Sequence, residues 1–202
     1  MREGFVYLDE AVPGIYWDAK YHTSDNFTGS KVDGYEVNRI VGTSQLARGL
    51  ALASRIAREK GLALFLWDGY RPLRAVRRFV KWAGEPENGR TKAAHYPNID
   101  KADIIPLGYV SERSAHSRGS AVDLTLCIKD TKALLDMGGI FDLMDASSHH
   151  AASGISEQAA RNRRLLKEIM EDSGFNPYNN EWWHYSLIDE PWPDDYFDFP
   201  IE

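Results

Sequence analysis

The sequence contains a single cysteine, Cys127, so no disulfide can form within the chain. This removes the main sequence indication of an oxidising compartment. The apolar run near the N-terminus is short and is interrupted by acidic residues, unlike the core of a secretory signal peptide. No stretch approaches the roughly 18 to 20 apolar residues that a membrane-spanning helix needs. We therefore expect a cytoplasmic protein with no membrane partner.

An excess of positive charge is also missing. The chain has 24 lysines and arginines against 30 aspartates and glutamates, and its formal net charge is -6. Nucleic-acid-binding proteins normally concentrate positive charge on one face, so we expect no nucleic-acid partner. The sequence is 43% hydrophobic and 27% charged, which is typical of a globular protein. We find no internal repeat and expect residues 1–202 to form a single domain.

Apolar periodicity and stop signals predict the helices. Apolar residues at helical spacing predict a core helix that is capped by Thr43 or Ser44 and ends near residue 60, before Gly61. Pro72 suits the first residue of a second helix, which we expect to run to about residue 83. Ser156 is expected to cap a third helix that ends near residue 173.

Continuous or aromatic apolar stretches predict the strands. We expect buried strands over residues 62–67, 121–128 and 182–187. Residues 84–110 are dense in Gly, Pro and Asn and predict a long ordered loop, and the proline-containing tail is expected to be irregular. Helices and strands do not alternate regularly. We therefore predict an α+β fold with a mostly antiparallel central sheet flanked by helices.

Two short segments combine the residue types of a catalytic metal site. The first reads Ser-Ala-His-Ser-Arg-Gly-Ser-Ala-Val-Asp over 114–123, and the second reads Glu-Trp-Trp-His over 181–184. Catalytic zinc typically takes three ligands from His, Asp and Glu and leaves one position for water. A non-ligating carboxylate nearby can take the water proton. The segments supply three candidate ligands and one spare acid, namely His116, Asp123, His184 and Glu181.

Each of these residues also has an ordinary explanation. A lone histidine is more often structural, and Glu181 could be a solvated loop acid. Residues three apart point to opposite faces of a regular strand, so Glu181 and His184 can share a site only if Glu181 lies in the preceding turn or at a bulge. Asp123 is the stronger indication, because a carboxylate in an apolar strand must be paired or ligated. The residues alone leave both a metal site and these ordinary explanations open.

Arg71 follows the strand that we expect over 62–67, in the segment Asp-Gly-Tyr-Arg-Pro. Site residues are common where a strand ends and a helix begins. A fixed guanidinium there can stabilise a developing oxyanion. Equally, Arg71 could pair with Asp68 and only fix the turn, so the residues leave both interpretations open.

The two segments resemble the zinc signatures of the D-alanyl-D-alanine metallopeptidases, which share a fold with the hedgehog amino-terminal domain. The similarity is to the VanX-type D-alanyl-D-alanine dipeptidases and extends over essentially the whole chain. It also rests on Asp-Asn-Phe-Thr-Gly at 25–29, Val-Asp-Gly-Tyr-Glu-Val-Asn-Arg at 32–39, Trp-Asp-Gly-Tyr-Arg-Pro at 67–72, Ser-His-His at 148–150 and Phe-Asp-Phe-Pro at 197–200.

The resemblance implies a role for each core position. His116, Asp123 and His184 match the zinc ligands, with one Zn²⁺ per chain. Glu181 matches the catalytic base, and Arg71 matches an arginine that stabilises the tetrahedral intermediate. The implied substrate is free D-Ala-D-Ala, cleaved to two D-alanines in vancomycin resistance or in D-Ala-D-Ala recycling during cell-wall metabolism.

A dipeptidase of this kind must recognise both free ends of its substrate. Asp142 is our candidate for the ammonium partner, and Ser114 and Tyr35 are candidates for hydrogen bonds to the substrate ends. Their ordinary alternatives are a turn cap, a loop hydroxyl and a half-buried aromatic ring. The adjacent His149 and His150 cannot easily direct both rings at one ion, so we expect one of them to pack or to support the site.

Two rival functions fit parts of the pattern. A zinc D,D-carboxypeptidase would need an open groove for a longer peptide and usually export. A zinc-stabilised binding module of the hedgehog kind would need neither Glu181 nor Arg71. The sequence leaves the oligomeric state open, a homo-oligomer included.

Overall fold

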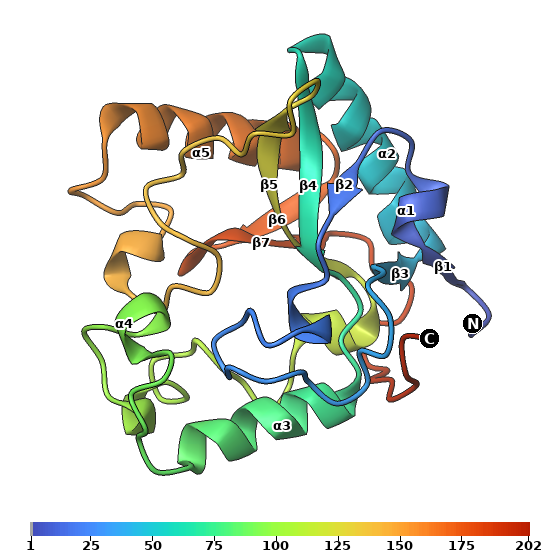
Figure 1. Cartoon of the computed structure of the whole chain (residues 1–202). Coiled ribbons are helices and arrows are strands. Elements are labelled where there is room, and N and C mark those ends of the chain that lie inside the picture. Colours follow the sequence, from blue (N-terminus) through green and yellow to red (C-terminus); the bar gives the residue numbers. More distant parts are fainter. Residues whose placement is uncertain (1) are drawn as a thin grey trace.

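The computed structural model describes residues 2–202, and its centre is a five-stranded sheet (Figure 1). The strand order is β2-β4-β5-β7-β6. The strands are β2 (Tyr16–Trp17), β4 (Leu62–Asp68), β5 (Ala121–Ile128), β6 (Phe175–Tyr178) and β7 (Glu181–Leu187). The short edge strand β2 pairs with β4 in parallel, and the other three pairings are antiparallel. The predicted α+β fold with a mostly antiparallel sheet is therefore confirmed.

Two long helices cover one face of this sheet. Helix α2 (Ser44–Glu59) contacts β4, helix α5 (Glu157–Glu171) contacts β5, β6 and β7, and the two helices also contact each other. Both begin as expected, because Thr43 Oγ1 accepts a hydrogen bond from the Leu46 N–H and Ser156 Oγ accepts one from the Ala159 N–H. Their buried residues face the sheet and form one layer of the core.

Helix α3 (Leu73–Gly84) lies on the opposite side of the molecule from α2 and α5, with irregular segments between it and the sheet (Figure 1). Pro72 precedes this helix and is not its first residue, because its ψ of 145° is extended. The amphipathic face of α3 buries Phe79 and Trp82 against these segments. The space between α3 and the sheet is where the candidate site lies.

The sequence pattern did not predict several short helices and strands of the structure. Strands β1 (Phe5–Tyr7) and β3 (Val41–Thr43) form a separate antiparallel pair, and helix α1 (Leu8–Ala11) follows β1. The expected loop over 84–110 contains helix α4 (Lys92–His95) and a 3-10 turn at Lys101–Asp103. Strand β6 was not expected; it contains Pro177 and lies at the edge of the sheet, where a missing N–H is tolerated.

The segment 195–201 is irregular, as expected, but it is tied to the chain around the site. The Phe197 N–H donates to the Ser117 carbonyl over 2.9 Å, and the Leu73 N–H donates to the Phe197 carbonyl over 3.0 Å. Ile201 forms a bridge with Tyr35. This segment therefore joins the start of α3, the turn before β5 and residues 34–36.

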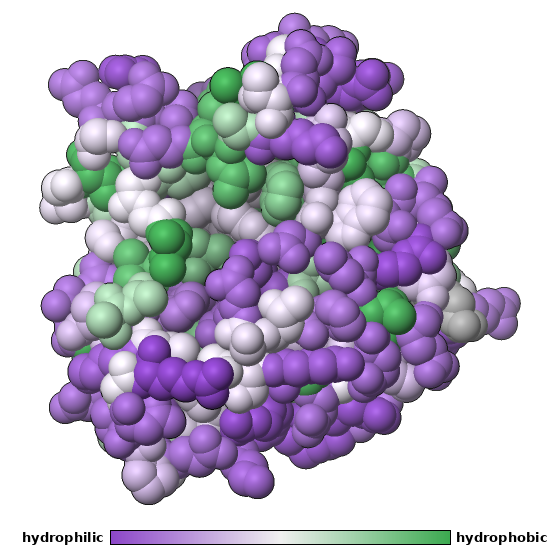
Figure 2. All heavy atoms as spheres, viewed as in Figure 1, coloured by the Kyte–Doolittle hydropathy of each residue, from purple (hydrophilic) through white to green (hydrophobic). Residues whose placement is uncertain are grey.

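Figure 2 shows that hydrophilic residues dominate one face of the molecule, with apolar side chains gathered around a hollow in its left half. Among the described residues, no helix is both long enough and apolar enough to cross a membrane. Cys127 is buried in β5, and its thiol lies 3.5 Å from the Ala63 carbonyl, so it packs as a small core residue.

Candidate active site and metal centre

The fold brings the three candidate ligands together. Asp123 in β5 and His184 in β7 are direct cross-strand partners, so their side chains emerge at the same level of the sheet. His116 lies in the 3-10 turn Ala115–Arg118 that precedes β5. Gly119 ends this turn with a φ of 76°, a left-handed conformation that glycine adopts without strain. The seven-residue step from His116 to Asp123 is therefore a turn followed by a strand.

The distances between the ligand atoms fit a tetrahedral ion. His184 Nδ1 lies 3.0 Å from Asp123 Oδ1, His116 Nε2 lies 3.2 Å from Asp123 Oδ2, and the two ring nitrogens are 3.1 Å apart. Ligand atoms that bind zinc at about 2.0 to 2.2 Å in a tetrahedron are about 3.3 to 3.6 Å apart, slightly more than these distances. No other group of three His, Cys, Asp or Glu side chains within residues 2–202 offers such an arrangement.

The second nitrogen of each imidazole is also engaged. His116 Nδ1 lies 2.6 Å from the Gly69 carbonyl, to which it must donate, so its Nε2 is free to ligate. His184 Nε2 lies 3.4 Å from Ser186 Oγ, and its Nδ1 faces Asp123. Such partners fix the tautomer and orientation of a ligating ring. Burial alone would raise the pKa of Asp123, but the two histidines lower it well below its usual range.

Glu181 reaches the same site because of an irregularity between β6 and β7. It is the first residue of β7, and the register of the two strands shifts between Pro177 and Tyr178, opposite Glu181. Glu181 Oε2 consequently lies 3.8 Å from His184 Nδ1, although regular strand geometry would separate residues three apart. Burial, followed by the charges of Asp123 and Asp142, raises the pKa of Glu181 well above its usual range.

Arg71 pairs with Asp68 and also faces the candidate site. Its Nε donates to Asp68 Oδ2 over 2.9 Å, which fixes the turn after β4. Its Nη2 also lies 3.4 Å from Asp123 Oδ2, and the guanidinium lines the cavity beside the candidate ligands. Asp68 is almost fully buried and accepts a second hydrogen bond of 2.8 Å from the Tyr35 hydroxyl. The guanidinium is thus held in place and still presented to the site.

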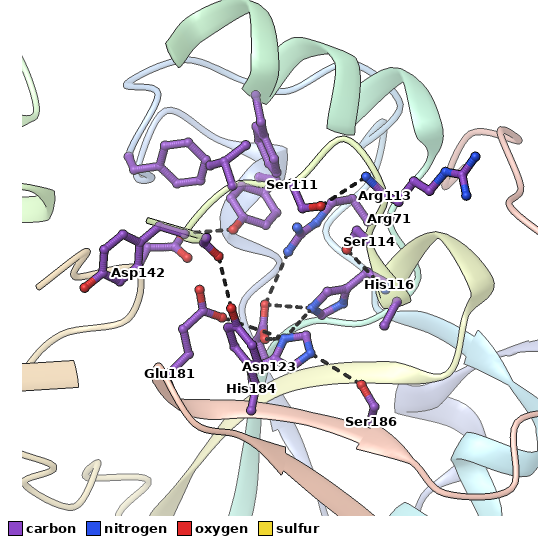
Figure 3. A pocket seen from close by; sticks show the side chains of 18 of the residues that line it. Arg71, Ser111, Arg113, Ser114, His116, Asp123, Asp142, Glu181, His184 and Ser186 are labelled. Carbon is purple, nitrogen blue, oxygen red and sulfur yellow. Dashed lines mark hydrogen bonds and ion pairs between the residues drawn. The ribbon is translucent and has the colours of Figure 1, made fainter. Parts of the chain in front are cut away.

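These side chains line one cavity of about 390 Å³ between the sheet and α3. Figure 3 shows Glu181 and Asp142 on one side of it, with Arg71 and His116 opposite them. Its volume is at the lower end of the range for ligand sites, about 300 to 1,000 Å³. The cavity therefore suits a small ligand.

The structure places two of the three predicted substrate-end residues in this cavity. Asp142 lines it, and its Oδ2 accepts a hydrogen bond of 2.8 Å from the Tyr21 hydroxyl. Burial raises the pKa of Asp142 well above its usual range. Ser114 also lines the cavity; its Oγ accepts from the His116 N–H, which leaves its own O–H free to donate.

Tyr35 is placed differently from the prediction. Its side chain is buried outside the cavity, and its hydroxyl is occupied by Asp68. The sequence did not indicate Tyr21, Ser186, Phe27 or Phe79, all of which line the cavity. No local pattern distinguishes these four residues from core residues, because their role depends on contacts with distant segments.

The adjacent histidines lie outside the cavity. The His149 Nε2 is 3.3 Å from the Tyr109 hydroxyl, and the His150 ring packs edge-on against Tyr185 with centroids 5.9 Å apart. His150 is therefore a packing residue, as expected of one member of the pair.

A family model and two relatives match the full chain. The family model described as D-ala-D-ala dipeptidase matches residues 1–202. A D-alanyl-D-alanine dipeptidase of Enterococcus faecium is 59% identical over 202 residues, and one of Streptomyces coelicolor is 56% identical over 201 residues; each match covers 100% of both chains. A solved structure of the vancomycin resistance D,D-pentapeptidase VanY with Zn(II) covers 75% of both chains at 19% identity and a TM-score of 0.45.

The full-length matches carry the assignment, and the five core positions of the resemblance meet in one cavity of the structure, namely Arg71, His116, Asp123, Glu181 and His184. The chain therefore belongs to the D-Ala-D-Ala dipeptidase family of peptidases.

Proposed function

We propose that this peptidase hydrolyses the free dipeptide D-Ala-D-Ala to two D-alanines with the help of a bound Zn²⁺. One observation carries the proposal: His116, Asp123 and His184 converge with near-tetrahedral spacing, and the partly buried Glu181 lies beside them without being one of the three ligands. The relatives that are 56% to 59% identical are D-alanyl-D-alanine dipeptidases, which supports the same substrate.

The donor set supports zinc and the presence of one ion per chain. Two imidazole nitrogens and one carboxylate oxygen are a common set for catalytic zinc, and three protein ligands leave a position for water. When bound, the ion would lower the pKa of that water to about 7 and polarise the scissile carbonyl. A structural zinc site usually has four protein ligands, which argues against a purely structural role.

The side chains around these ligands supply the remaining chemistry. We propose that Glu181 takes the proton of the attacking water and passes it to the leaving amine, because its raised pKa allows it to hold that proton. We assign to Arg71 the stabilisation of the tetrahedral oxyanion. The pairing with Asp68 fixes the guanidinium before substrate arrives, and Tyr35 supports Asp68 instead of contacting the substrate.

The two ends of the dipeptide would lie on opposite sides of the ligand cluster. Asp142 is our partner for the substrate ammonium, since it is a buried carboxylate on the cavity wall with one oxygen already held by Tyr21. The free O–H of Ser114 is our donor to the substrate carboxylate. A cavity of about 390 Å³ favours a dipeptide over the longer substrate of a carboxypeptidase. The presence of both Glu181 and Arg71 disfavours a binding module without catalysis.

We further propose that residues 1–202 act as one catalytic domain, in the cytoplasm, where D-Ala-D-Ala would be removed during vancomycin resistance or recycled in cell-wall metabolism. The proposed site does not depend on whether the protein is a monomer or a homo-oligomer, because every residue proposed for it lies in one chain.

The experiment is release of D-alanine from D-Ala-D-Ala by the purified protein, with and without a chelator, beside a Glu181→Gln variant. We expect turnover that the chelator abolishes and Zn²⁺ restores. The variant should retain zinc, measured by atomic emission, and lose activity. L-Ala-L-Ala and N-acylated D-Ala-D-Ala should not be cleaved. Cleavage of the acylated peptide would make the protein a carboxypeptidase, and no turnover by the folded, zinc-loaded protein would refute the proposal.

A further inference from the structure

We infer that His95 is a positioning residue that holds Asp142 in the conformation required to bind the substrate ammonium. The inference rests on the proposed role of Asp142 and adds a residue that no sequence pattern marks. His95 ends the short helix α4, within the segment 84–110 that joins α3 to the site. It does not line the cavity and touches none of the candidate metal ligands.

The backbone of Asp142 needs such support. Its φ is 58°, in the left-handed region that residues other than glycine rarely adopt. Aspartate tolerates this region better than most residues, but the conformation persists only when its surroundings impose it.

Two hydrogen bonds of His95 hold Asp142 in this backbone conformation. His95 Nδ1 lies 3.1 Å from the Asp142 carbonyl oxygen, and the Met144 N–H donates to the His95 carbonyl over 2.7 Å. His95 is thereby hydrogen-bonded to the chain at Asp142 and again two residues later, at Met144. The Tyr21 hydroxyl holds the carboxylate of Asp142 from the other side, so backbone and side chain are fixed independently.

The protonation state of His95 suits this contact. A carbonyl oxygen can only accept, so His95 must carry a proton on Nδ1. Burial lowers the pKa of His95, and the ring is therefore neutral at pH 7 with its single N–H directed to Asp142. A neutral donor supports the carbonyl without adding a positive charge that would compete with the substrate ammonium for the carboxylate.

The segment that carries His95 is itself anchored at both ends. The Thr91 hydroxyl donates to the Phe27 carbonyl over 2.6 Å, and Asn98 Nδ2 donates to Asp145 Oδ2 over 2.7 Å. Figure 1 shows α4 directly beside the turn formed by residues 141–148. The long segment after α3 thus acts as a brace for the ammonium site instead of a free loop.

The test is a His95→Phe variant, which keeps the ring but loses the donor, beside His95→Asn. Asparagine Nδ2 and histidine Nδ1 both branch from Cγ, so the asparagine amide can reach the same carbonyl. In the Glu181→Gln background, where no turnover occurs, the Kd for D-Ala-D-Ala is measured by calorimetry. We expect His95→Phe to weaken binding about tenfold, the scale of one lost hydrogen bond, and His95→Asn to restore most of it.

Kinetics in the otherwise native enzyme give a second measurement. Asp142 would contact the ammonium equally in the ground state and the transition state, so His95→Phe should raise KM about tenfold with kcat within about twofold. His150→Phe is the control, because it replaces a partly buried histidine outside the cavity and should leave both constants within about twofold. In an Asp142→Asn background, His95→Phe should have no further effect on KM.

Three results would overturn the inference: an unchanged Kd and KM in His95→Phe, a fall in kcat with KM unchanged, or the same KM rise in the Asp142→Asn background. A merely structural His95 would lower Tm and the active fraction without moving KM. Failure of the proposed function looks different, because the unaltered protein would then release no D-alanine at all.

Discussion

The two sides of the cavity are built in different ways. On the sheet side, Asp123 and His184 are cross-strand partners, and Glu181 starts the same strand as His184. On the loop side, Asp142 and Tyr21 come from segments 121 residues apart that belong to no strand of the central sheet. The sheet side owes its geometry to backbone pairing, whereas the loop side owes it to individual side-chain contacts.

This difference matches the division of the proposed chemistry. Metal binding and proton transfer need atoms fixed to within a fraction of an ångström, which strands in register provide. Recognition of the two substrate ends depends on loop residues that can differ between relatives without disturbing the sheet. Changes on the sheet side should therefore act on metal content or kcat, and changes on the loop side should act on KM.

Loss of a ligand from the sheet side should have the largest effect. Asp123→Ala removes one of three ligands and leaves the two imidazoles without their shared carboxylate, so we expect zinc loss and a fall in kcat/KM of about a thousandfold or more. Zinc content and D-alanine release would be measured together. Thr125→Ala is the matched control, since Thr125 is buried two residues further along β5; a similar loss in the control would point to damage to the strand.

Arg71→Met tests the residue that joins the two sides. The substitution keeps the length of the side chain and removes the donors, so the developing oxyanion loses its partner. We expect kcat to fall about 100-fold to 1,000-fold with a small change in KM, measured by steady-state kinetics on D-Ala-D-Ala. A rise in KM with kcat preserved would instead place Arg71 among the substrate-end contacts of the loop side.

Ser114→Ala is the corresponding test for the loop side. The substitution removes a donor to the substrate carboxylate, and we expect KM to rise about tenfold with kcat unchanged. The Ser114 hydroxyl also caps the turn that carries His116. Zinc affinity, measured by competition with a chromogenic chelator, should separate these roles, because weaker zinc binding would assign Ser114 to the sheet side.

The smallest expected effect concerns His150, which lies outside the cavity. It tests whether the stability of the protein can change while the sheet side and the loop side stay unaltered. Burial, followed by the positive charges of Lys167 and Arg163, lowers the pKa of His150 from its ordinary 6.5 to about 4. The unfolded chain therefore takes up the proton first as the pH falls, and the free energy of unfolding should decrease between pH 6.5 and 4.

Because the ring is partly exposed, we expect a contribution of about 1 to 2 kcal/mol over that range. Urea unfolding of the native chain and of His150→Phe at several pH values would measure it. Two curves that run parallel from pH 7 to pH 4 would contradict the assignment. Neither kinetic constant at pH 7 should differ between the two proteins.

The sheet side is also the part that the sequence predicts well. The apolar runs of β4 and β5, the helices capped by Thr43 and Ser156, and the turn at Gly119 all carry local signals, and the structure contains each of them. His116, Asp123, Glu181 and His184 converge as the two segments suggested. Strand pairing here converts sequence spacing into spatial proximity, and the resemblance to the family supplied the roles that the residues alone left open.

The loop side could not be predicted in the same way. Tyr35 was expected at the substrate and instead supports Asp68, while Tyr21 and His95 carried no signal but act on Asp142. Nothing within a few positions of these residues states which distant group they contact. Strand β6 escaped prediction for a related reason, since four residues that include Pro177 form a strand only because β7 pairs with them.

The segment 195–201 also determines when the site can form during synthesis of the chain. It follows every proposed site residue in the chain, yet its hydrogen bonds to Ser117 and Leu73 hold the turn with His116 and the start of the helix after Arg71. During synthesis the ribosome adds these residues after all the proposed site residues, at about 5 to 20 residues per second. A nascent chain that already contains His184 therefore still lacks the segment that holds the turn with His116. Activity should begin only after Ile201 has been added.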